Sequence, residues 1–333
     1  MRAMERTTGD PRDVLRPYQS VVVRYRLTSP DPLTGAHLTD AVGVVAAADA
    51  STVVVRTRTG EVTIPLASVT AARVVARRPP ADVTMSRLER VMVPAWGALE
   101  RHRIGGWYLR ASRGYSYRGN SLVPAGDPGL PLEAALEEAS TWLRARRLPL
   151  RVAVPGPLGT GAAEDPVGAA VLARGGREHT PVIVMTASTD EVASAASREP
   201  RVVGIRVTSA PDEAWMAAHG RSRPLDPRVA RRVLLGSPDQ AFVSVVGDGH
   251  VVATGRLGIG AGWGGFGAVW VDPERRRDHL GLAVAWSLAD AAASRGIRSL
   301  HLQVEEGNVA ARALWERVGF APHHRYSYAE ADR

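Results

Sequence analysis

The sequence contains no cysteine, which excludes disulfides, thiolate metal ligands and a cysteine nucleophile. It also contains no lysine, so all 42 basic residues are arginine. Without lysine, Schiff-base chemistry, a phosphate-loop lysine and acetylation of the chain's own lysines are excluded. No run of about 18 apolar residues occurs, and the polar residues 1–13 lack the apolar core of a signal peptide. We therefore expect a cytoplasmic protein with no membrane partner.

The composition is that of a globular protein with several domains. Its 333 residues are 45% hydrophobic and 23% charged, enough to bury a core in two or three domains. The net charge of +8 favours polyanionic partners, either phosphate-bearing cofactors or nucleic acid. A GC-rich coding sequence would produce the same arginine bias without any such partner.

The N-terminal segment has the pattern of a small β domain. Short runs rich in β-branched residues, joined by turns, cover residues 20–27, 41–46, 52–58, 62–66 and 69–75. This pattern predicts an SH3-like β-barrel over residues 15–78. Arginine pairs two residues apart on these strands share a face and would allow contact with nucleic acid. The polar exterior of any small barrel explains them better, so nucleic acid is not the favoured partner.

Beyond a proline-containing linker at 77–82, the sequence predicts two α/β halves, over residues 83–195 and 200–330. In the first half we expect helices at 87–102 and 132–146 and strands at 106–111, 115–123, 150–154 and 180–186. In the second we expect a hairpin at 241–255, strands at 268–271, 300–304 and 325–329, and helices at 280–294 and 309–318. The order of elements is similar, so the halves are interpreted as diverged copies of one unit.

The segment Val269–Ala283 carries the most chemical information. A strand ends at Val271, Pro273 turns the chain, and an arginine-rich loop opens directly into a helix. The first N–H groups of such a helix have no partner within the helix, and its dipole adds partial positive charge. A diphosphate is the ligand that this arrangement favours, although a solvated basic helix start would have the same sequence.

The sequence that follows this loop resembles the GCN5-related N-acetyltransferase (GNAT) family. Arg276-Arg277-Asp278-His279-Leu280-Gly281 matches the family's R/Q-x-x-G-x-G/A loop, except that His279 replaces its first glycine. A later strand, Asn308, and an A-x-x-L-Y-x-x-x-G-F-like segment ending at Phe320 complete the pattern, with Trp315 in place of the tyrosine. The resemblance covers about residues 200–330. It implies an α/β GNAT fold with a central mixed sheet.

The resemblance also implies the ligand and the residues that hold it. Acetyl-CoA would be the co-substrate, with no metal, and its pantetheine would lie between two parting strands, 268–271 and 300–304. The residues implied in binding it lie on the first strand, on the loop, at the helix start and before the last helix: Val269, Val271, Arg276, Arg277, Asp278, His279, Leu280, Gly281, Leu282, Ala283 and Asn308.

Family resemblance implies direct transfer of the acetyl group to an amine, without a covalent enzyme intermediate. An amide near Val271 would polarise the acetyl carbonyl. The first strand has no acid, so Glu305, just past the second strand, is the candidate base, with Glu306 as an alternative. Indole is not an acid near neutral pH, so Trp315 is interpreted as a core residue and Tyr326 or Tyr328 as the group that returns a proton.

The first half lacks the features of the cofactor loop. Its segment 123–131 has no arginine, one acid and three prolines, which have no N–H to donate. The whole resembles tandem-type acetyltransferases with an N-terminal SH3-like barrel, a degenerate first half and an active second half.

Two further features have less specific patterns. His323 and His324 are adjacent on a predicted strand, where side chains alternate between faces, so a surface or packing role is expected rather than a metal site. The glycine-rich segment 260–267 fits either a flexible loop over the acceptor site or a wide hairpin.

We therefore predict an acetyl-CoA-dependent N-acetyltransferase that acts on a small-molecule or peptide primary amine. The alternatives are an acyl-CoA-binding regulatory protein that has lost catalysis, and an adaptor that binds nucleic acid or protein through the barrel. The acceptor stays open, and a homodimer is compatible with the sequence.

Overall fold

The computed structural model describes residues 15, 20–32, 34–57, 60–74, 83–196, 203–222 and 226–331. The chain divides into two compact units, Met1–Arg78 and Pro79–Arg333, and each is described by itself. The linker predicted at 77–82 lies outside the described residues.

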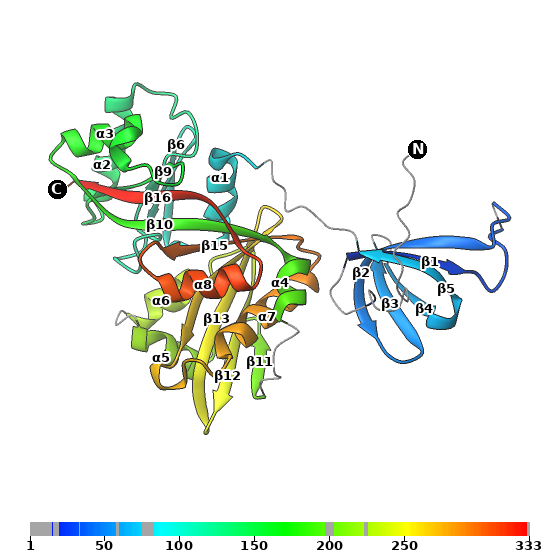
Figure 1. Ribbon diagram of the computed structural model, residues 1–333. Helices are drawn as coiled ribbons and strands as arrows, with labels where there is room; N and C mark the ends of the chain where they lie inside the picture. Colours follow the sequence, from blue (N-terminus) through cyan, green and yellow to red (C-terminus); the bar gives the residue numbers. More distant parts are fainter. Residues whose placement is uncertain are drawn as a thin grey trace. The chain divides into compact units, whose positions relative to one another are not determined.

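The N-terminal unit is a five-stranded antiparallel sheet with the strand order β4-β3-β2-β1-β5 (Figure 1). The strands are β1 (Ser20–Arg26), β2 (Leu38–Ala48), β3 (Thr52–Thr57), β4 (Gly60–Pro65) and β5 (Val69–Val74). Alternate valines on β1 and β3 are buried in its core, which confirms the period-two strands. An SH3-like barrel stays a prediction.

The arginine pairs predicted on this unit are only partly described. The Arg24 guanidinium donates two hydrogen bonds of 2.8 Å to the Asp40 carboxylate on the neighbouring strand. Arg58 lies outside the described residues. The pairing neutralises the charge of Arg24, so this arginine offers little attraction to a phosphate backbone.

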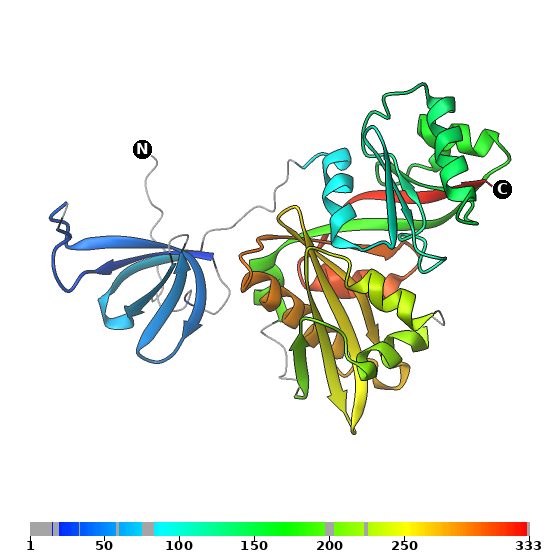
Figure 2. The ribbon, with the colours of Figure 1, turned by 180° about the vertical axis from the view of Figure 1, so that it is seen from behind.

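The second unit is built on an 11-stranded mixed sheet (Figures 1 and 2). Its strand order is β11-β12-β13-β14-β15-β10-β16-β9-β8-β7-β6. The strands of the N-terminal part are β6 (Glu100–Ile104), β7 (Trp107–Ala111), β8 (Leu122–Val123), β9 (Leu150–Gly156) and β10 (Arg177–Ser188). Those of the C-terminal part are β11 (Ile205–Thr208), β12 (Asp239–Gly247), β13 (His250–Gly260), β14 (Trp263–Val271), β15 (Ser299–Glu305) and β16 (Ala321–Ala331).

Eight α-helices lie among the described residues of this unit. They are α1 (Met85–Ala95), α2 (Leu132–Arg144), α3 (Pro166–Ala173), α4 (Thr189–Ala196), α5 (Glu213–Ser222), α6 (Pro227–Leu234), α7 (Leu280–Ala293) and α8 (Val309–Arg317). Along β13, Gly255 faces α7 and Arg256 faces α6 and the end of α1. Because side chains alternate along a strand, α7 lies on one face of the sheet and α1 and α6 on the other.

The two halves of this unit exchange their last strands. β10, from the N-terminal half, pairs with β15 and β16, and β16, from the C-terminal half, pairs with β10 and β9. All of these pairings are antiparallel. The exchange makes one continuous sheet from residues that are far apart in the sequence.

Two segments differ from the sequence-based prediction. The helix predicted over 87–102 ends at Ala95, and Glu100–Ile104 form strand β6. Pro94 has no N–H for the helix ladder, and Trp96 closes the last turn by donating to Val93. The strand predicted over 115–123 is limited to Leu122–Val123, because the Asn120 side chain bonds four backbone groups in the preceding turn.

Candidate active site

The two strands predicted to part do so in the structure. β14 and β15 pair in parallel from Trp263 with Ser299 to Phe266 with Leu302. Beyond Phe266, β14 keeps register only with β13, across an irregularity at which Ala268 takes a φ of 50°. The strands therefore form a fork that opens after residues 266 and 302, as the family resemblance implied.

The loop before α7 has the backbone that a glycine-containing loop would have. His279, the N-terminal cap of α7, has φ 58° and ψ 10°, and Arg277 has a φ of 74°. The left-handed region favours glycine but tolerates histidine better than most residues. His279 thus takes a backbone conformation that favours glycine. Leu282 and Ala283 donate to its carbonyl, whereas the N–H groups of Leu280 and Gly281 precede the first helical acceptor.

Charge at this loop is arranged to accept an anion. The Arg275 guanidinium donates to Asp278 at 2.7 Å and to Asp248 at 2.9 Å, which raises the pKa of Arg275 and neutralises the loop's own carboxylate. Arg276 and Arg277 are exposed, and no ion pair joins them to a carboxylate in the described part of the chain. Two guanidinium groups are therefore available at the start of α7.

Helix α7 contacts the Leu314 side chain of helix α8 at Gly281, and a larger residue there would make that side chain shift. A Cβ at Gly281 would lie 2.9 Å from Leu314 Cδ2. On the other side of α8, Trp315 is 5% exposed and makes edge contacts with Phe266 and Phe320. The prediction that Trp315 is a core residue is confirmed.

The side chains of the implied cofactor residues fall into two groups. Leu280 and Leu282 point into the core, so only their backbone can face a ligand. The others are exposed or half-buried at the fork, on the loop or before α8: Val269, Val271, Arg276, Arg277, Asp278, His279, Gly281, Ala283 and Asn308. Asn308 caps α8, since its Oδ1 accepts the Ala311 N–H at 3.1 Å.

A small cavity lies beside the fork, with room for about one water molecule (≈ 10 Å³). Gln303, one residue beyond the last parallel pair, lines it together with Tyr326 and Tyr328 of β16. The remaining lining residues are Glu89, Met92, Val93, Arg110, Arg118, Val123 and Ala153. Sequence reasoning named the two tyrosines, and it placed Arg110 and Arg118 on strands where they could meet an anionic acceptor or simply be solvated. It did not name Gln303 or Glu89.

Tyr326 is held in this cavity by hydrogen bonds. Its hydroxyl donates to Gln303 Oε1 at 2.9 Å and lies 3.4 Å from the Tyr328 hydroxyl. The side chain is 4% exposed, and burial raises its pKa well above the usual value. Tyr326 is therefore protonated at neutral pH and can donate a hydrogen bond. Because its pKa is raised, it transfers the proton completely only to a group whose own pKa is also raised by burial, as that of a buried thiol is.

The two carboxylates predicted as bases lie at the far end of β15. Glu305 is exposed at the end of that strand, where it pairs with Val182 of β10. Glu306 follows it, and its N–H donates to the Pro181 carbonyl at 2.8 Å. Both carboxylates are outside the lining of the small cavity.

A third carboxylate, Glu89 of α1, lies in the cavity wall and belongs to a hydrogen-bonded chain. His324 Nε2 is 2.8 Å from Glu89 Oε1, His324 Nδ1 is 2.8 Å from His323 Nδ1, and His323 Nε2 is 2.9 Å from the Val83 carbonyl. The prediction that the two histidines point to opposite faces is wrong. The register of β16 against β10 skips His323, and this bulge turns both rings toward one another.

The Val83 carbonyl can only accept, so the contact with it needs a hydrogen on His323 Nε2. Burial lowers the pKa of His323, which favours its neutral form.

His301, on β15 before the strands part, is also buried but does not belong to this hydrogen-bonded chain. It is 4% exposed, and neither ring nitrogen has a hydrogen-bond partner among the described residues. Burial lowers its pKa to about 3, so the ring is neutral at physiological pH. It lies against Gly265, where an added Cβ would come within 2.5 Å of the ring.

The glycine-rich segment 260–267 forms a tight hairpin and no flexible loop. Ala261 and Gly262 make a two-residue turn with φ of 51° and 77° between β13 and β14. Its glycines, with Gly258, let the end of α1 approach: a Cβ at Gly258 would lie 2.1 Å from the Ala95 carbonyl, and one at Gly260 2.7 Å from Pro94. Arg256 Nη1 donates to the same carbonyl at 2.9 Å. These contacts hold the C-terminal end of α1 against β13, and they thereby fix the position of Glu89 on the same helix.

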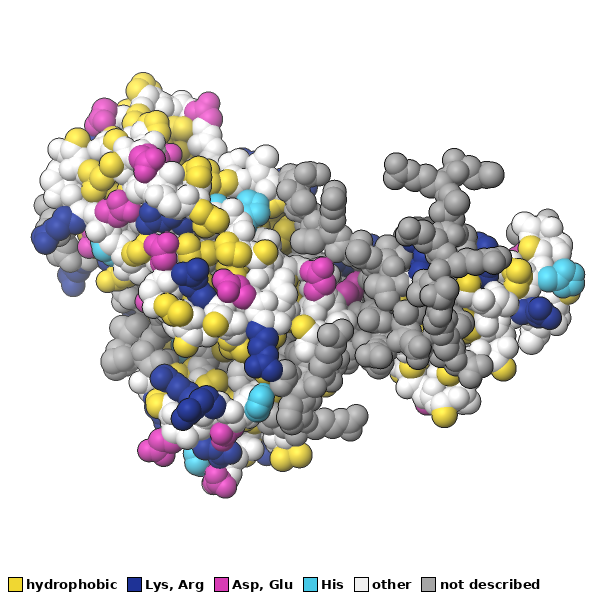
Figure 3. Space-filling model, viewed as in Figure 1, with side chains coloured by type: hydrophobic (Ala, Val, Ile, Leu, Met, Phe, Trp, Pro, Cys, Tyr) yellow, Lys and Arg dark blue, Asp and Glu magenta, His cyan; other side chains and the backbone are white. Residues whose placement is uncertain are grey.

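Among the described residues, no group of three or more histidine or carboxylate side chains could hold a metal ion. None of the helices described is long and apolar enough to cross a membrane. On the face shown in Figure 3, basic and acidic side chains of the second unit are interspersed, so the net positive charge is not gathered there.

Comparisons with known proteins agree with this geometry. Residues 83–329 match the family model "Probable histone acetyltransferase Rv0428c C-terminal". The probable histone acetyltransferase Rv0428c of Mycobacterium tuberculosis is 30% identical over 323 residues, covering 93% of this chain and 94% of that protein. The uncharacterized N-acetyltransferase YobR of Bacillus subtilis is 24% identical, covering 73% and 96%.

Among solved structures, the GCN5-related N-acetyltransferase from Kribbella flavida superposes with a TM-score of 0.53 at 18% identity, over 75% of this chain and 96% of that one. This likeness shows the GNAT fold. The fork, the loop before α7 and the extent of the family match lead to one conclusion. The chain belongs to the Rv0428c C-terminal acetyltransferase family and is an N-acetyltransferase with a GNAT fold.

Proposed function

We propose that the protein transfers an acetyl group from acetyl-CoA directly to a primary amine, using the C-terminal half as the active half. The observation that carries this proposal is the fork between β14 and β15 beside an anion-accepting helix start. The amine nitrogen forms the new C–N bond, the C–S bond breaks, a base takes the ammonium proton, and the thiolate sulfur receives one.

The residues at the fork and loop fit acetyl-CoA. Arg276, Arg277 and the first N–H groups of α7 would hold its diphosphate. Val269 and Val271 are half-buried on the part of β14 that has left β15, so this edge of the strand is available for pantetheine. When bound, acetyl-CoA supplies the acetyl group; a strand N–H near Val271 would polarise its carbonyl.

Tyr326 is the group that we assign to the proton at sulfur. Its hydroxyl is protonated, buried and held by Gln303 at the fork. These features support a donor that is oriented before the ligand binds. Tyr328, 3.4 Å away, is the alternative named from sequence.

Two carboxylates are candidates for the base, and they differ in position. Glu305 was named from sequence and is exposed, whereas Glu89 is 4% exposed, lines the cavity and connects through His324 to His323. We propose Glu89 as a second candidate because its carboxylate lies in the wall of the cavity that holds Tyr326, whereas Glu305 lies outside it.

Replacing each carboxylate by its amide distinguishes them. The substitution at the true base is expected to lower kcat about 10²- to 10⁴-fold and to flatten the rising limb of the pH–rate profile. The measurement is thiol release against pH for Glu305→Gln, Glu306→Gln and Glu89→Gln, with Glu316→Gln, at an exposed carboxylate on α8, as the control. If Glu305→Gln leaves both rate and profile unchanged, Glu305 is not the base.

We further propose that the second unit arose as a tandem of two GNAT-like halves, the first of which no longer binds the cofactor. Both halves show an antiparallel hairpin, a strand, a helix, a parallel strand, a helix and an exchanged strand in the same order. In the first half α2 begins after Pro131 without a side-chain cap, and the arginine at its start, Arg174, is already ion-paired with Glu133 at 2.6 Å.

Calorimetry with acetyl-CoA and thiol release over a panel of amines test the proposed function. The panel includes small amines and a lysine-rich peptide, since the Mycobacterium tuberculosis relative is named a probable histone acetyltransferase. Binding together with thiol release is the expected result. Binding without release for any amine would favour a regulatory acyl-CoA-binding protein.

A further inference from the structure

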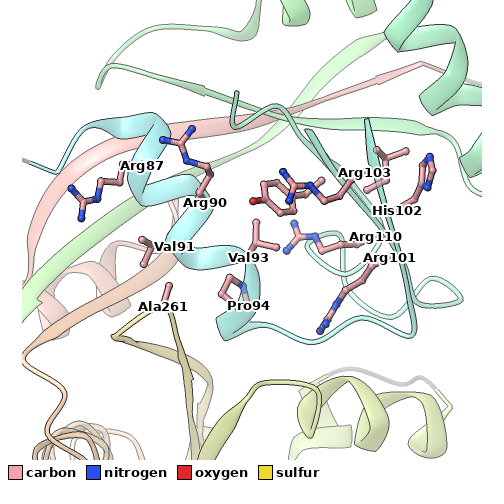
Figure 4. A pocket seen from close by; sticks show the side chains of 12 residues that line it. Arg87, Arg90, Val91, Val93, Pro94, Arg101, His102, Arg103, Arg110 and Ala261 are labelled. Carbon is pink, nitrogen blue, oxygen red and sulfur yellow. The ribbon is translucent and has the colours of Figure 1, made fainter. Parts of the chain in front are cut away.

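A second, larger cleft of about 630 Å³ lies between α1, the β6–β7 hairpin and the β13–β14 turn (Figure 4). Five arginines line it, and no carboxylate does: Arg87 and Arg90 from α1, Arg101 and Arg103 from β6, and Arg110 from β7. None of these residues was used in the assignment of the acetyl-CoA site.

The register of β6 with β7 and the spacing along α1 place the positively charged arginine side chains close together. In the β6–β7 register Arg101 is directly opposite Arg110, and Arg103 is opposite Tyr108, so their side chains share one face. Arg87 and Arg90 are one turn apart on α1. Like charges at such positions destabilise the fold, so this arrangement is unfavourable until an anion binds.

The arginines are oriented without being neutralised. Arg90 donates to the Ala125 carbonyl at 2.8 Å, Arg101 to Gly236 at 2.9 Å and Arg103 to Gly105 at 3.1 Å. Carbonyl oxygens accept hydrogen bonds but carry no charge. No ion pair joins any of the five to a carboxylate within the described ranges.

Arg110 connects this cleft to the cavity at the fork. It lines both, as does Val93, and it is 4% exposed. Its Nη2 donates to Ser121 Oγ at 3.2 Å, but its buried Nε has no hydrogen-bond partner among the residues described. Burial lowers the pKa of Arg110 to about 10, so it is still charged at pH 7. A buried cationic donor without a partner is costly, and an anionic ligand would satisfy it.

We infer that this cleft binds the acceptor and that the acceptor is a small primary amine carrying a phosphate or several carboxylates. The inference rests on the proposed function, because it names the substrate class of the same site. The volume is within the range of small-molecule sites, and guanidinium groups pair with phosphate and carboxylate through two hydrogen bonds at once.

The same charges also act on the amine. Arg110 and Arg118 line the cavity beside Tyr326, and nearby positive charge lowers the pKa of a bound ammonium. The neutral amine, which is the nucleophile, is thereby favoured. Conversely, a lysine-rich peptide is repelled by the five arginines of the cleft, so basic peptides are poor acceptors for this chain.

The binding test uses inorganic pyrophosphate and the full chain saturated with CoA, so that the loop before α7 is already occupied. Calorimetry is expected to show binding that weakens with salt. The double variant Arg101→Ala/Arg103→Ala should weaken binding at least tenfold. Arg144→Ala, an exposed arginine on α2 that pairs with Glu137, is the control and should leave it unchanged. Equal affinity in all three proteins, or no binding to the wild type, overturns the inference.

The kinetic test compares two matched amines, ethanolamine and phosphoethanolamine, which differ by one phosphate. We expect kcat/KM at least tenfold higher for the phosphate-bearing amine, and loss of that preference in the double variant but not in Arg144→Ala. Thermal unfolding of each variant checks that it is folded.

The outcomes separate the two proposals. If both amines are acetylated equally by wild type and double variant, the anionic-acceptor inference is wrong and the proposed function stands. If acetyl-CoA does not bind, the proposed function fails. If acetyl-CoA binds but neither amine is acetylated, the pyrophosphate titration alone decides the inference.

Discussion

The second unit has two parallel strand pairs, β14–β15 and β8–β9, and their surroundings differ; for comparison both are called forks. In the C-terminal half, β14 and β15 stop pairing after Phe266 and Leu302, and Gln303 and Tyr326 line a cavity next to this point. In the N-terminal half, the printed parallel pair is Leu122 with Val152. Around that pair the fork is filled by apolar side chains that are at most 5% exposed, among them Leu109, Leu136 and Val154.

Helices α7 and α2, which follow β14 and β8, also differ in the polar groups at their N-terminal ends. The loop before α7 presents Arg276 and Arg277 and has a left-handed cap at His279. The segment before α2 ends in Pro131 and carries Asp127, whose carboxylate accepts the Gly129 N–H at 2.8 Å. The comparison teaches that the proposed ligand site lies at the fork that polar groups line, whereas the fork that apolar side chains fill serves as core.

The largest expected effect is on stability, and it tests whether the apolar side chains around the β8–β9 pair form part of the core. Leu136 is fully buried there, and Leu136→Ala should lower the free energy of unfolding by about 2–5 kcal/mol through lost burial and a cavity. Urea unfolding measures it, with Val309→Ala, at a side chain 70% exposed, as the control within about 0.5 kcal/mol. A loss below about 1 kcal/mol would show that this fork is loosely packed and reopen it as a site.

Next in size is the effect of the loop arginines on acetyl-CoA affinity. The double variant Arg276→Ala/Arg277→Ala should raise the Kd about 10- to 100-fold, since each charged hydrogen bond contributes about 1.5–3 kcal/mol and solvent screening reduces this. Calorimetry measures it. Arg295→Ala/Arg298→Ala, at exposed positions after α7, is the matched control. Equal Kd values in the two double variants would contradict an anion site at the start of α7.

A smaller effect is expected at the tyrosine of the open fork. Tyr326→Phe removes the donor at the fork and should lower kcat about tenfold or more while the Kd for acetyl-CoA stays the same. Tyr115→Phe is the control, because its buried hydroxyl lies 2.8 Å from His219 Nε2, away from the fork cavity lining. Equal kcat values for the two variants would remove Tyr326 from the reaction.

The smallest effect concerns stability in mild acid. Burial lowers the pKa of His301 to about 3, whereas the unfolded chain protonates it near the usual value of about 6.5. The unfolded state therefore binds the proton first, and stability falls as pH decreases below about 6.5. The expected loss is about 1 kcal/mol at pH 6.

Urea unfolding of wild type and His301→Leu at pH 7.5 and pH 6 measures this loss as a difference between the two proteins. The same dependence on pH in both would show that His301 is protonated in the folded state.

Much of the site could be predicted because it is local in the sequence. The loop 276–281, helix α7 and the parting strands depend on short segments whose residue order sets their geometry. Glu89 could not be predicted, because it meets His324 across 235 positions of sequence. The bulge at His323 changes which face a side chain takes, and nothing in the strand pattern indicates it.

Most of the arginine cleft was missed for a related reason. Arg110 lies on a predicted strand and was named as a possible acceptor contact, but the other four arginines come from α1 and β6, and β6 was predicted as the end of a helix. Only the strand register shows that Arg101 and Arg110 are opposite one another. Strand exchange was likewise invisible, because β10 and β16 have the same β pattern whichever half they join.

The exchanged strands have a consequence for biogenesis. When β10 leaves the ribosome, neither β15 nor β16 has been synthesised, and β9 lacks the neighbour that it has in the finished sheet. The nascent chain must keep these hydrogen-bonding edges unmatched until translation is almost complete, and such edges are prone to aggregate. A gene fragment cut between the two halves should therefore yield insoluble protein, while the two fragments co-expressed should rescue one another.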